Sequence, residues 1–249
     1  MIYITGDTHS DVSRFSTTEF PEQMLMSKND YVIVCGDFGL VWNGSKRENY
    51  WLDWLENKPF TTLFVSGNHE NFDMLKTYPV EEWHGGKVQF IRPSIIHLMR
   101  GQVFEDVGGK RIFAMGGAAS HDIKDGILDP NDPEFHEKRK YLDRIYAMYR
   151  VLGVSWWPEE MPSEEEYAEA EKNLNACGRS VDLIVTHCAP SSIVDVIGSG
   201  FYQHDKLTDY FEQLKNNCDY KDWFFGHYHE NRPIGRKFFM LYEKIIKLD

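Results

Sequence analysis

Short apolar runs recur through the first quarter of the chain, and each stops where small and polar residues begin. They cover residues 2–5, 31–35 and 62–65, and residues 50–55 between the last two have helical apolar spacing. A continuous apolar run of this length is typical of a strand that is covered on both faces. Alternation of strand and helix favours parallel strands joined by crossover helices, so we expect the carboxyl ends of these strands at one edge of a sheet.

The pattern changes after this first unit and then returns. Residues 95–115 contain three apolar segments separated by Arg100-Gly101 and by Gly108-Gly109, which predicts a hairpin or a meander. Further strands are expected at residues 183–186, 223–225 and 238–242, with an amphipathic helix over residues 207–214.

The least regular stretch covers residues 118–180. Residues 129–133 read Asp-Pro-Asn-Asp-Pro, which predicts a loop, and a helix is expected over residues 141–151. Ser163 with Glu166 matches a capping box, so a second helix should run from there to about residue 177. We therefore expect one domain over residues 1–249 with a partly irregular, partly helical insertion around residues 118–180.

Composition and charge narrow the class of protein. The chain has 249 residues, 42% of them hydrophobic, which is enough for one substantial core. A formal net charge of -12 argues against an extended nucleic-acid groove, because such grooves depend on lysine and arginine. No apolar run approaches the roughly 20 residues that cross a bilayer, and the chain starts without a basic leader. With four widely spaced cysteines and no Cys-x-x-Cys pair, we expect a cytoplasmic protein with reduced thiols and no membrane contact.

Polar side chains follow five of the expected strands. A single histidine in such a place is more often a capping or solvated side chain than a ligand, but half of the ten histidines lie there. Imidazole, carboxylate and amide donors together suit Zn²⁺, Fe or Mn²⁺ better than Ca²⁺, and the lack of thiolates argues against a closed structural zinc site. The residues are Asp7, His9, Asp37, Asn68, His69, His187, His227 and His229.

The order of these motifs carries a resemblance. Asp-x-His, Gly-Asp, Gly-Asn-His-Glu, Thr-His and Gly-His-x-His follow one another from Asp7 to His229. This order resembles the calcineurin-like metallophosphoesterase superfamily. The resemblance implies an α/β fold, a two-sheet mixed β-sandwich flanked by helices, with two divalent or transition metal ions at the strand ends.

The resemblance also implies a role for each residue. Asp37 would bridge the two ions, and His69 would lie outside their ligands and protonate the leaving group as general acid. A hydroxide between the ions would attack phosphorus, so no Ser or Cys nucleophile is needed and Cys188 is read as structural. Two ions and two carboxylates leave the site at about +2, which attracts a phosphate. One ion would be held by Asp7, His9, Asp37 and His229, and the other by Asp37, Asn68, His187 and His227.

The substrate is less clearly indicated than the site. Leu40 and Val41 stand where the Ser/Thr protein phosphatase branch has Asp and Arg, which counts against that branch. The main hypothesis is a phosphoesterase acting on a small phosphomonoester or phosphodiester. A non-catalytic metal-binding scaffold on the same fold and a nucleic-acid-processing phosphodiesterase stay open as alternatives. Natural substrate, metal identity and oligomeric state stay open as well.

Several other residues have two readings each. Glu70 could hydrogen-bond behind the site or be exposed, and a loop role is slightly preferred for His121 and Asp122 over lining the pocket. Trp156 and Trp157 could cover the site, although anchoring to the core is preferred. Four arginines could contact substrate, with a surface role preferred, and four histidines are treated as non-ligands: Arg14, Arg100, Arg144, Arg150, His84, His97, His136 and His204.

Overall fold

Two mixed β-sheets pack face to face in the computed structural model, which describes residues 1–198 and 202–248. The first sheet has the strand order β15-β1-β2-β3-β6-β5-β4. Its parallel centre is formed by β1, β2, β3 and β6, in agreement with the predicted crossover unit. The bounds are β1 Ile2–Thr5, β2 Tyr31–Val34, β3 Thr61–Phe64, β4 Val80–Trp83, β5 Gly86–Arg92, β6 Ile95–Leu98 and β15 Ile246–Lys247.

The second sheet has the order β13-β14-β12-β11-β8-β7. At its centre β11 runs parallel to both β8 and β12, so the carboxyl ends of these strands share one edge. The two sheets confirm the predicted mixed sandwich. The bounds are β7 Gln102–Val107, β8 Lys110–Met115, β11 Leu183–Thr186, β12 Asp222–Phe225, β13 Arg232–Ile234 and β14 Phe238–Met240.

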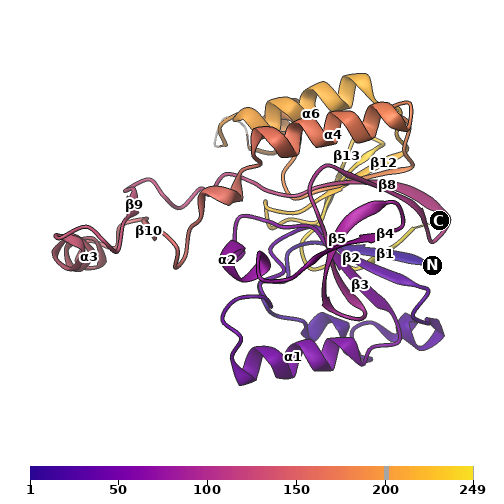
Figure 1. Cartoon of the computed structure of the whole chain (residues 1–249). Coiled ribbons are helices and arrows are strands. Elements are labelled where there is room, and N and C mark those ends of the chain that lie inside the picture. The colour runs from indigo at the N-terminus through magenta and orange to yellow at the C-terminus, as the bar shows by residue number, and fades with distance from the viewer. Residues whose placement is uncertain (199–201, 249) are drawn as a thin grey trace.

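Helices cover both outer faces of the sandwich (Figure 1). Helix α1 lies on the outer side of the first sheet, and α4 and α6 lie together on the outer side of the second. Helix α4 begins with the predicted capping box, because Ser163 Oγ accepts from Glu166 N at 3.3 Å and Glu166 Oε2 accepts from Ser163 N at 2.8 Å. The bounds are α1 Lys46–Glu56, α2 Phe72–Leu75, α4 Glu164–Ala176, α5 Ser191–Gly198 and α6 Lys206–Asn217.

The core has three layers. Strand β2 is apolar at every position because both of its faces are buried. Tyr31 and Ile33 face the second sheet, whereas Val32 and Val34 face the layer that contains α1. Phe224 of β12 lies in the layer between the sheets, and the third layer joins the second sheet to α4 and α6. Burial on both faces fixes the strands firmly, so their carboxyl ends are rigid supports for the polar residues that follow.

The segment that carries β9, α3 and β10, residues 127–151, forms an arm that extends away from the sandwich (Figure 1). The helix predicted over residues 141–151 was wrong in its position: α3 spans Phe135–Arg144, and β10 Arg150–Val151 pairs with β9 Ile127–Leu128. None of the residues of α3 is buried. Its sequence, Phe-His-Glu-Lys-Arg-Lys-Tyr-Leu-Asp-Arg, is mostly charged, so few apolar positions mark where the helix begins and ends.

Two other segments of the sheets also differ from what the sequence pattern indicates. A hairpin or a meander was expected over residues 95–115. Strands β7 and β8 form a hairpin in the second sheet, whereas β6 joins the first sheet, so the segment is divided between the two. Strand β4 is largely exposed, and its Val-Glu-Glu-Trp sequence gives no clear alternation. Among the described residues, no helix combines the length and the apolar character needed to cross a bilayer.

A pair of substitutions tests the contrast between sandwich and arm. Phe224 is 1% exposed between the sheets, whereas Tyr141 on α3 is 53% exposed. We expect Phe224→Ala to lower the free energy of unfolding by about 3–5 kcal/mol, since it removes a buried ring and leaves a cavity. Tyr141→Ala should change it by less than about 0.5 kcal/mol. Urea titration measures both values, and comparable losses would contradict the layered core described above.

Candidate metal centre

The polar residues predicted at five strand ends converge at one place between the two sheets. Asp7 follows β1, Asp37 follows β2 and Asn68 follows β3 in the first sheet, while His187 and His227 follow β11 and β12 in the second. Backbone contacts join the two sets, because His227 N donates to both Asp7 carboxylate oxygens at 3.0 and 3.1 Å. The two sheets therefore supply the side chains of one site.

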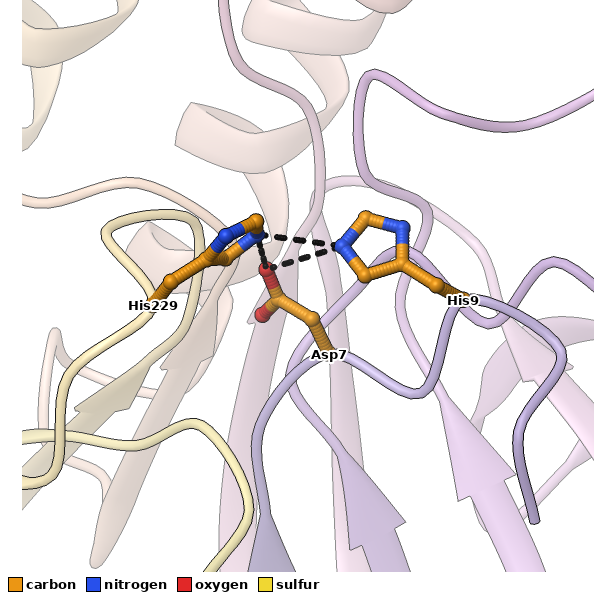
Figure 2. Close-up of side chains that lie close together, drawn as sticks. All are labelled: Asp7, His9 and His229. Carbon is orange, nitrogen blue, oxygen red and sulfur yellow. Dashed lines mark hydrogen bonds and ion pairs between the residues drawn. The ribbon is translucent and has the colours of Figure 1, made fainter.

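Asp7, His9 and His229 form the first group of donors (Figure 2). The Nε2 atoms of the two histidines lie 3.0 Å apart, and Asp7 Oδ2 lies 3.2 Å from His229 Nε2 and 3.8 Å from His9 Nε2. Two nitrogens at right angles around an ion, each about 2.1 Å from it, would be about 3.0 Å apart. The spacing of the three donor atoms therefore fits a shared cation.

Asp7, Asp37 and His187 form the second group, and all three are buried. His187 Nε2 lies 3.4 Å from Asp37 Oδ2 and 3.1 Å from Asn68 Oδ1. The other ring nitrogen, Nδ1, lies 2.7 Å from the carbonyl oxygen of Cys35. Donation to that carbonyl places the proton of a neutral ring on Nδ1 and leaves Nε2 as a donor for a metal.

Asp37 belongs to the second group and also lies close to His9 of the first. Its Oδ2 is 3.7 Å from His9 Nε2 as well as 3.4 Å from His187 Nε2. Its Oδ1 accepts from the backbone N–H of His69 at 2.7 Å, which fixes the orientation of the carboxylate. The position is the one that a carboxylate shared by two ions would need.

The electrostatics of the site favour a cation. Burial opposes a charge on His187, but the carboxylates of Asp37 and Asp7 outweigh this and raise the pKa of His187 to about 9. The two acids are almost fully buried, and buried carboxylates require nearby positive charge. A proton on His187 supplies one positive charge, and a divalent ion that takes the place of this proton at Nε2 would supply two. The donor set therefore fits metal ions.

His227 is placed beside the second group. Its ring centroid lies 5.0 Å from that of His187 and 4.3 Å from that of His121. Burial holds the pKa of His227 well below its usual value, so its ring is neutral and can donate a lone pair. Across the described residues, neither group of three donors includes His227, and His121 flanks it on the outer side.

The backbone at the site is unusual. His9, Asp37, His227 and His229 have φ angles of 44°, 47°, 69° and 52°, in the left-handed region that side chains other than glycine rarely adopt. Such conformations cost free energy and gather at functional sites. Four of the residues predicted as ligands thus share this conformation.

Two glycines allow the carboxylates to sit against the turns. A Cβ atom on Gly67 would lie 2.0 Å from Asp37 Oδ1, and a Cβ atom on Gly226 would lie 2.0 Å from Asp7 Oδ1. No side chain can occupy either position without displacing a carboxylate. The glycine that precedes Asn68 and the one that precedes His227 are therefore required by the packing of the site.

Glu70 lies behind the site and is fully buried. Its carboxylate accepts from the backbone N–H of Phe38 at 2.8 Å and of Gly39 at 3.3 Å, so it holds the turn that follows Asp37. Burial and the nearby charge of Asp37 raise the pKa of Glu70 to about 8. Of the two readings given to Glu70, the structure supports the hydrogen-bonding one.

Ser120 and Glu160 support the site and were not anticipated. Asn68 Nδ2 donates to Ser120 Oγ at 3.3 Å, which turns the amide oxygen toward His187. Ser120 donates in turn to Glu160, from Oγ to Oε2 at 2.6 Å and from N to Oε1 at 3.0 Å. Ser120 follows Gly116-Gly117 at the end of β8, so the strand-end pattern could have indicated it. Nothing local indicates Glu160.

Two of the candidate arginines, Arg14 and Arg100, hold the backbone of other segments. Arg14 donates to the backbone oxygens of Asp7 and Tyr242, and Arg100 donates to those of Glu159 and Glu160. These contacts are buried or half-buried, so the preferred surface role was wrong for both.

The remaining candidates lie on the arm and at its base. Arg144 lies over the ring of Tyr141 on the exposed helix α3. Arg150 pairs with Asp122, and both influence the charge of His69. Trp157 is buried in the core and donates to Asp73, in agreement with an anchoring role.

The comparison with known protein families decides the identity. The family model described as calcineurin-like phosphoesterase matches residues 1–231. The chain belongs to the calcineurin-like phosphoesterase family. The match covers every residue of the site and all strands of the two sheets except β13, β14 and β15. It confirms the resemblance found in the sequence. A similar curated protein, lariat debranching enzyme A of Xenopus laevis, is 24% identical over 169 residues, which are 61% of this chain and 29% of that protein. The chain thus spans less than a third of that relative.

Glu160→Gln tests the support of Asn68. A glutamine amide can donate to Ser120 Oγ, which then turns its own proton toward Asn68 and favours the flipped amide with nitrogen facing His187. We expect the affinity for Mn²⁺, measured by calorimetry, to fall about tenfold, as is common when a hydrogen-bond partner of a metal ligand is altered. The control is Glu159→Gln, whose side chain pairs with Lys76 at the surface. Unchanged affinity in Glu160→Gln would remove Glu160 from this role.

Proposed function

We propose that this calcineurin-like phosphoesterase is a metal-dependent hydrolase that acts on a small phosphorylated substrate, either a phosphomonoester or a phosphodiester. The proposal rests on the two groups of donors, which share Asp7 and are linked further by Asp37, a member of the second group whose carboxylate lies near His9 of the first. They lie beside a cavity whose wall includes His9 and His69. A cationic centre next to an accessible cavity is the arrangement that phosphate-ester hydrolysis needs.

Two divalent ions, with Mn²⁺, Fe or Zn²⁺ preferred, would be held by the residues named from the sequence. Asp7, His9, Asp37 and His229 would hold one ion, and Asp37, Asn68, His187 and His227 the other. Since the donors come from both sheets, we also propose that the sandwich acts as one domain. When bound, the ions would polarise the phosphoryl oxygens and lower the pKa of a water molecule at phosphorus.

His69 is the proposed general acid. Its backbone N–H is tied to Asp37, while its ring lies 5.4 Å from that of His9 and lines the cavity. Burial lowers the pKa of His69, so an anionic ester beside the ring would be needed to favour its protonated form. The ring would then deliver a proton to the leaving oxygen as the bond to phosphorus breaks.

The first test of the function is Mn²⁺ dependence. Hydrolysis of p-nitrophenyl phosphate and of its bis-ester is measured after removal of metal and again after addition of Mn²⁺. A rate that appears with Mn²⁺ supports the proposal, and preference for one ester distinguishes monoester from diester chemistry. A protein that binds Mn²⁺ without hydrolysing either ester would be the scaffold alternative.

His69→Asn tests the general acid. We expect a loss of about 100-fold or more on an alkyl phosphate, whose leaving group needs a proton, and a much smaller loss on p-nitrophenyl phosphate. Metal content, measured by elemental analysis, should stay at the wild-type level because the backbone bond to Asp37 is kept. Equal losses on the two esters would contradict the role.

Asp37→Asn tests the shared carboxylate. The amide keeps the acceptor for the His69 N–H but loses the negative charge, so we expect occupancy of both metal positions to fall after dialysis, with affinity weakened at least about 100-fold. Asp143→Asn on the exposed face of α3 is the matched control. A variant that still holds two ions would show that Asp37 does not bridge them.

A nucleic-acid diester is the second candidate substrate, favoured by the relative that is named for lariat debranching. The formal charge of -12 weighs against an extended contact with phosphates. Binding to an oligonucleotide that weakens steeply as salt is raised would favour this candidate.

A further inference from the structure

A cavity of about 450 Å³ opens beside the candidate metal centre. His9 and His69 lie at its inner end, and the segment that follows Asp37 forms one wall together with the start of α1. Its volume lies in the range of small-molecule sites and exceeds what a phosphate group needs. The outer wall includes Trp42, Asn43, Arg47, Glu48 and Trp51.

The wall is held in place by Glu48. Its carboxylate accepts from the backbone N–H groups of Trp42, Asn43 and Gly44 at 3.1, 2.8 and 3.0 Å. Three such bonds to one carboxylate fix a loop that has no regular secondary structure. The cavity is therefore preformed on this side.

Two half-buried indoles are fixed at the cavity. Trp42 packs edge-to-face on Trp157, with ring centroids 5.6 Å apart and planes at 89°, and its carbonyl accepts from Asn71 Nδ2 at 2.6 Å. Trp51 is held between Tyr50 and Trp54 at centroid distances of 5.2 and 5.5 Å. Rings that are fixed by neighbours and still line a cavity are suited to contact a flat aromatic group.

We propose that this cavity binds the base of a nucleoside leaving group, so that the substrate is a phosphate ester of a nucleoside. The cavity adjoins His69, which places it on the leaving-group side. Trp42 and Trp51 offer aromatic surface, Asn43 offers an amide to a base edge, and Arg47 lies at the exposed rim. The proposal rests on the proposed function.

The reaction balances with water as the only co-reactant. Water adds its oxygen to phosphorus, the bond from phosphorus to the nucleoside oxygen breaks, and that oxygen takes a proton from His69. The ring of His69 is protonated again from the proton that the attacking water releases. The products are the phosphate and the free nucleoside, whose base stays in the cavity until release.

The first arm of the test measures binding of a nucleoside without a phosphate. Adenosine is titrated into the Mn²⁺-loaded protein by calorimetry. Stacking of a base on one indole predicts that Trp51→Leu weakens adenosine binding about tenfold. Trp51→Phe should keep most of the affinity. Tyr141→Leu removes an aromatic ring from the exposed helix α3, outside the cavity, and should stay within about twofold of the wild type. Circular dichroism checks that each variant is folded.

The second arm measures selectivity. The ratio of kcat/KM for adenosine monophosphate to that for glycerol phosphate should fall about tenfold in Trp51→Leu and stay near the wild-type value in Tyr141→Leu. If the protein hydrolyses diesters, the methyl esters of both compounds replace them. Hydrolysis without adenosine binding, or equal changes in Trp51→Leu and Tyr141→Leu, would overturn the nucleoside site and leave the phosphoesterase function standing. Trp51-dependent adenosine binding without hydrolysis would keep the site and overturn the function.

Discussion

Two carboxylates without access to solvent determine how this protein is organised. Asp7 and Asp37 are 0% and 1% exposed, and a buried carboxylate is stable only beside compensating charge and hydrogen-bond donors. Burial opposes ionisation, yet the rings of His187, His69 and His9 hold the pKa of Asp37 well below its usual value. Both sheets must therefore bring their strand ends together, because the compensating groups come from each of them.

Four residues of this centre have strained backbone conformations. Left-handed conformations at His9, Asp37, His227 and His229 each cost roughly 1–3 kcal/mol, and the buried strands on either side hold them in place. Gly67 and Gly226 contribute by leaving out a side chain where a carboxylate must lie. The stability of the three-layer core thus supports a site that is locally unfavourable.

Segments outside the sheets adjust the site without carrying its main donors. The stretch from Ser120 to Glu160 includes the exposed arm, yet its two ends meet at Asn68 through a chain of hydrogen bonds. On the opposite side, Glu48 fixes the loop that carries Trp42 beside the cavity. The sheets set the position of the donors, and these segments set their orientation and the shape of the space around them.

The strand ends could be read from the sequence because burial on both faces produces unbroken apolar runs, as in β1, β2 and β11. Each run stops where the chain leaves the core, so Asp7, Asp37 and His187 stood out by position. The order of the motifs then indicated the family that the comparison confirmed. The exposed helix α3 was misplaced because its sequence is mostly charged and few apolar positions mark its bounds.

Only the tertiary structure decided how distant residues support one another. The carboxylate of Glu160 is hydrogen-bonded to Ser120, 40 positions away in the sequence, and that of Glu70 to Phe38, 32 positions away. Neither contact can be recognised from neighbouring residues in the sequence. The same holds for the cavity, which forms where the loop after Asp37 packs against α1. The candidate metal ligands can be recognised from the residues that directly follow each strand. Their orientation and the shape of the cavity depend on packing between segments that are far apart in the chain.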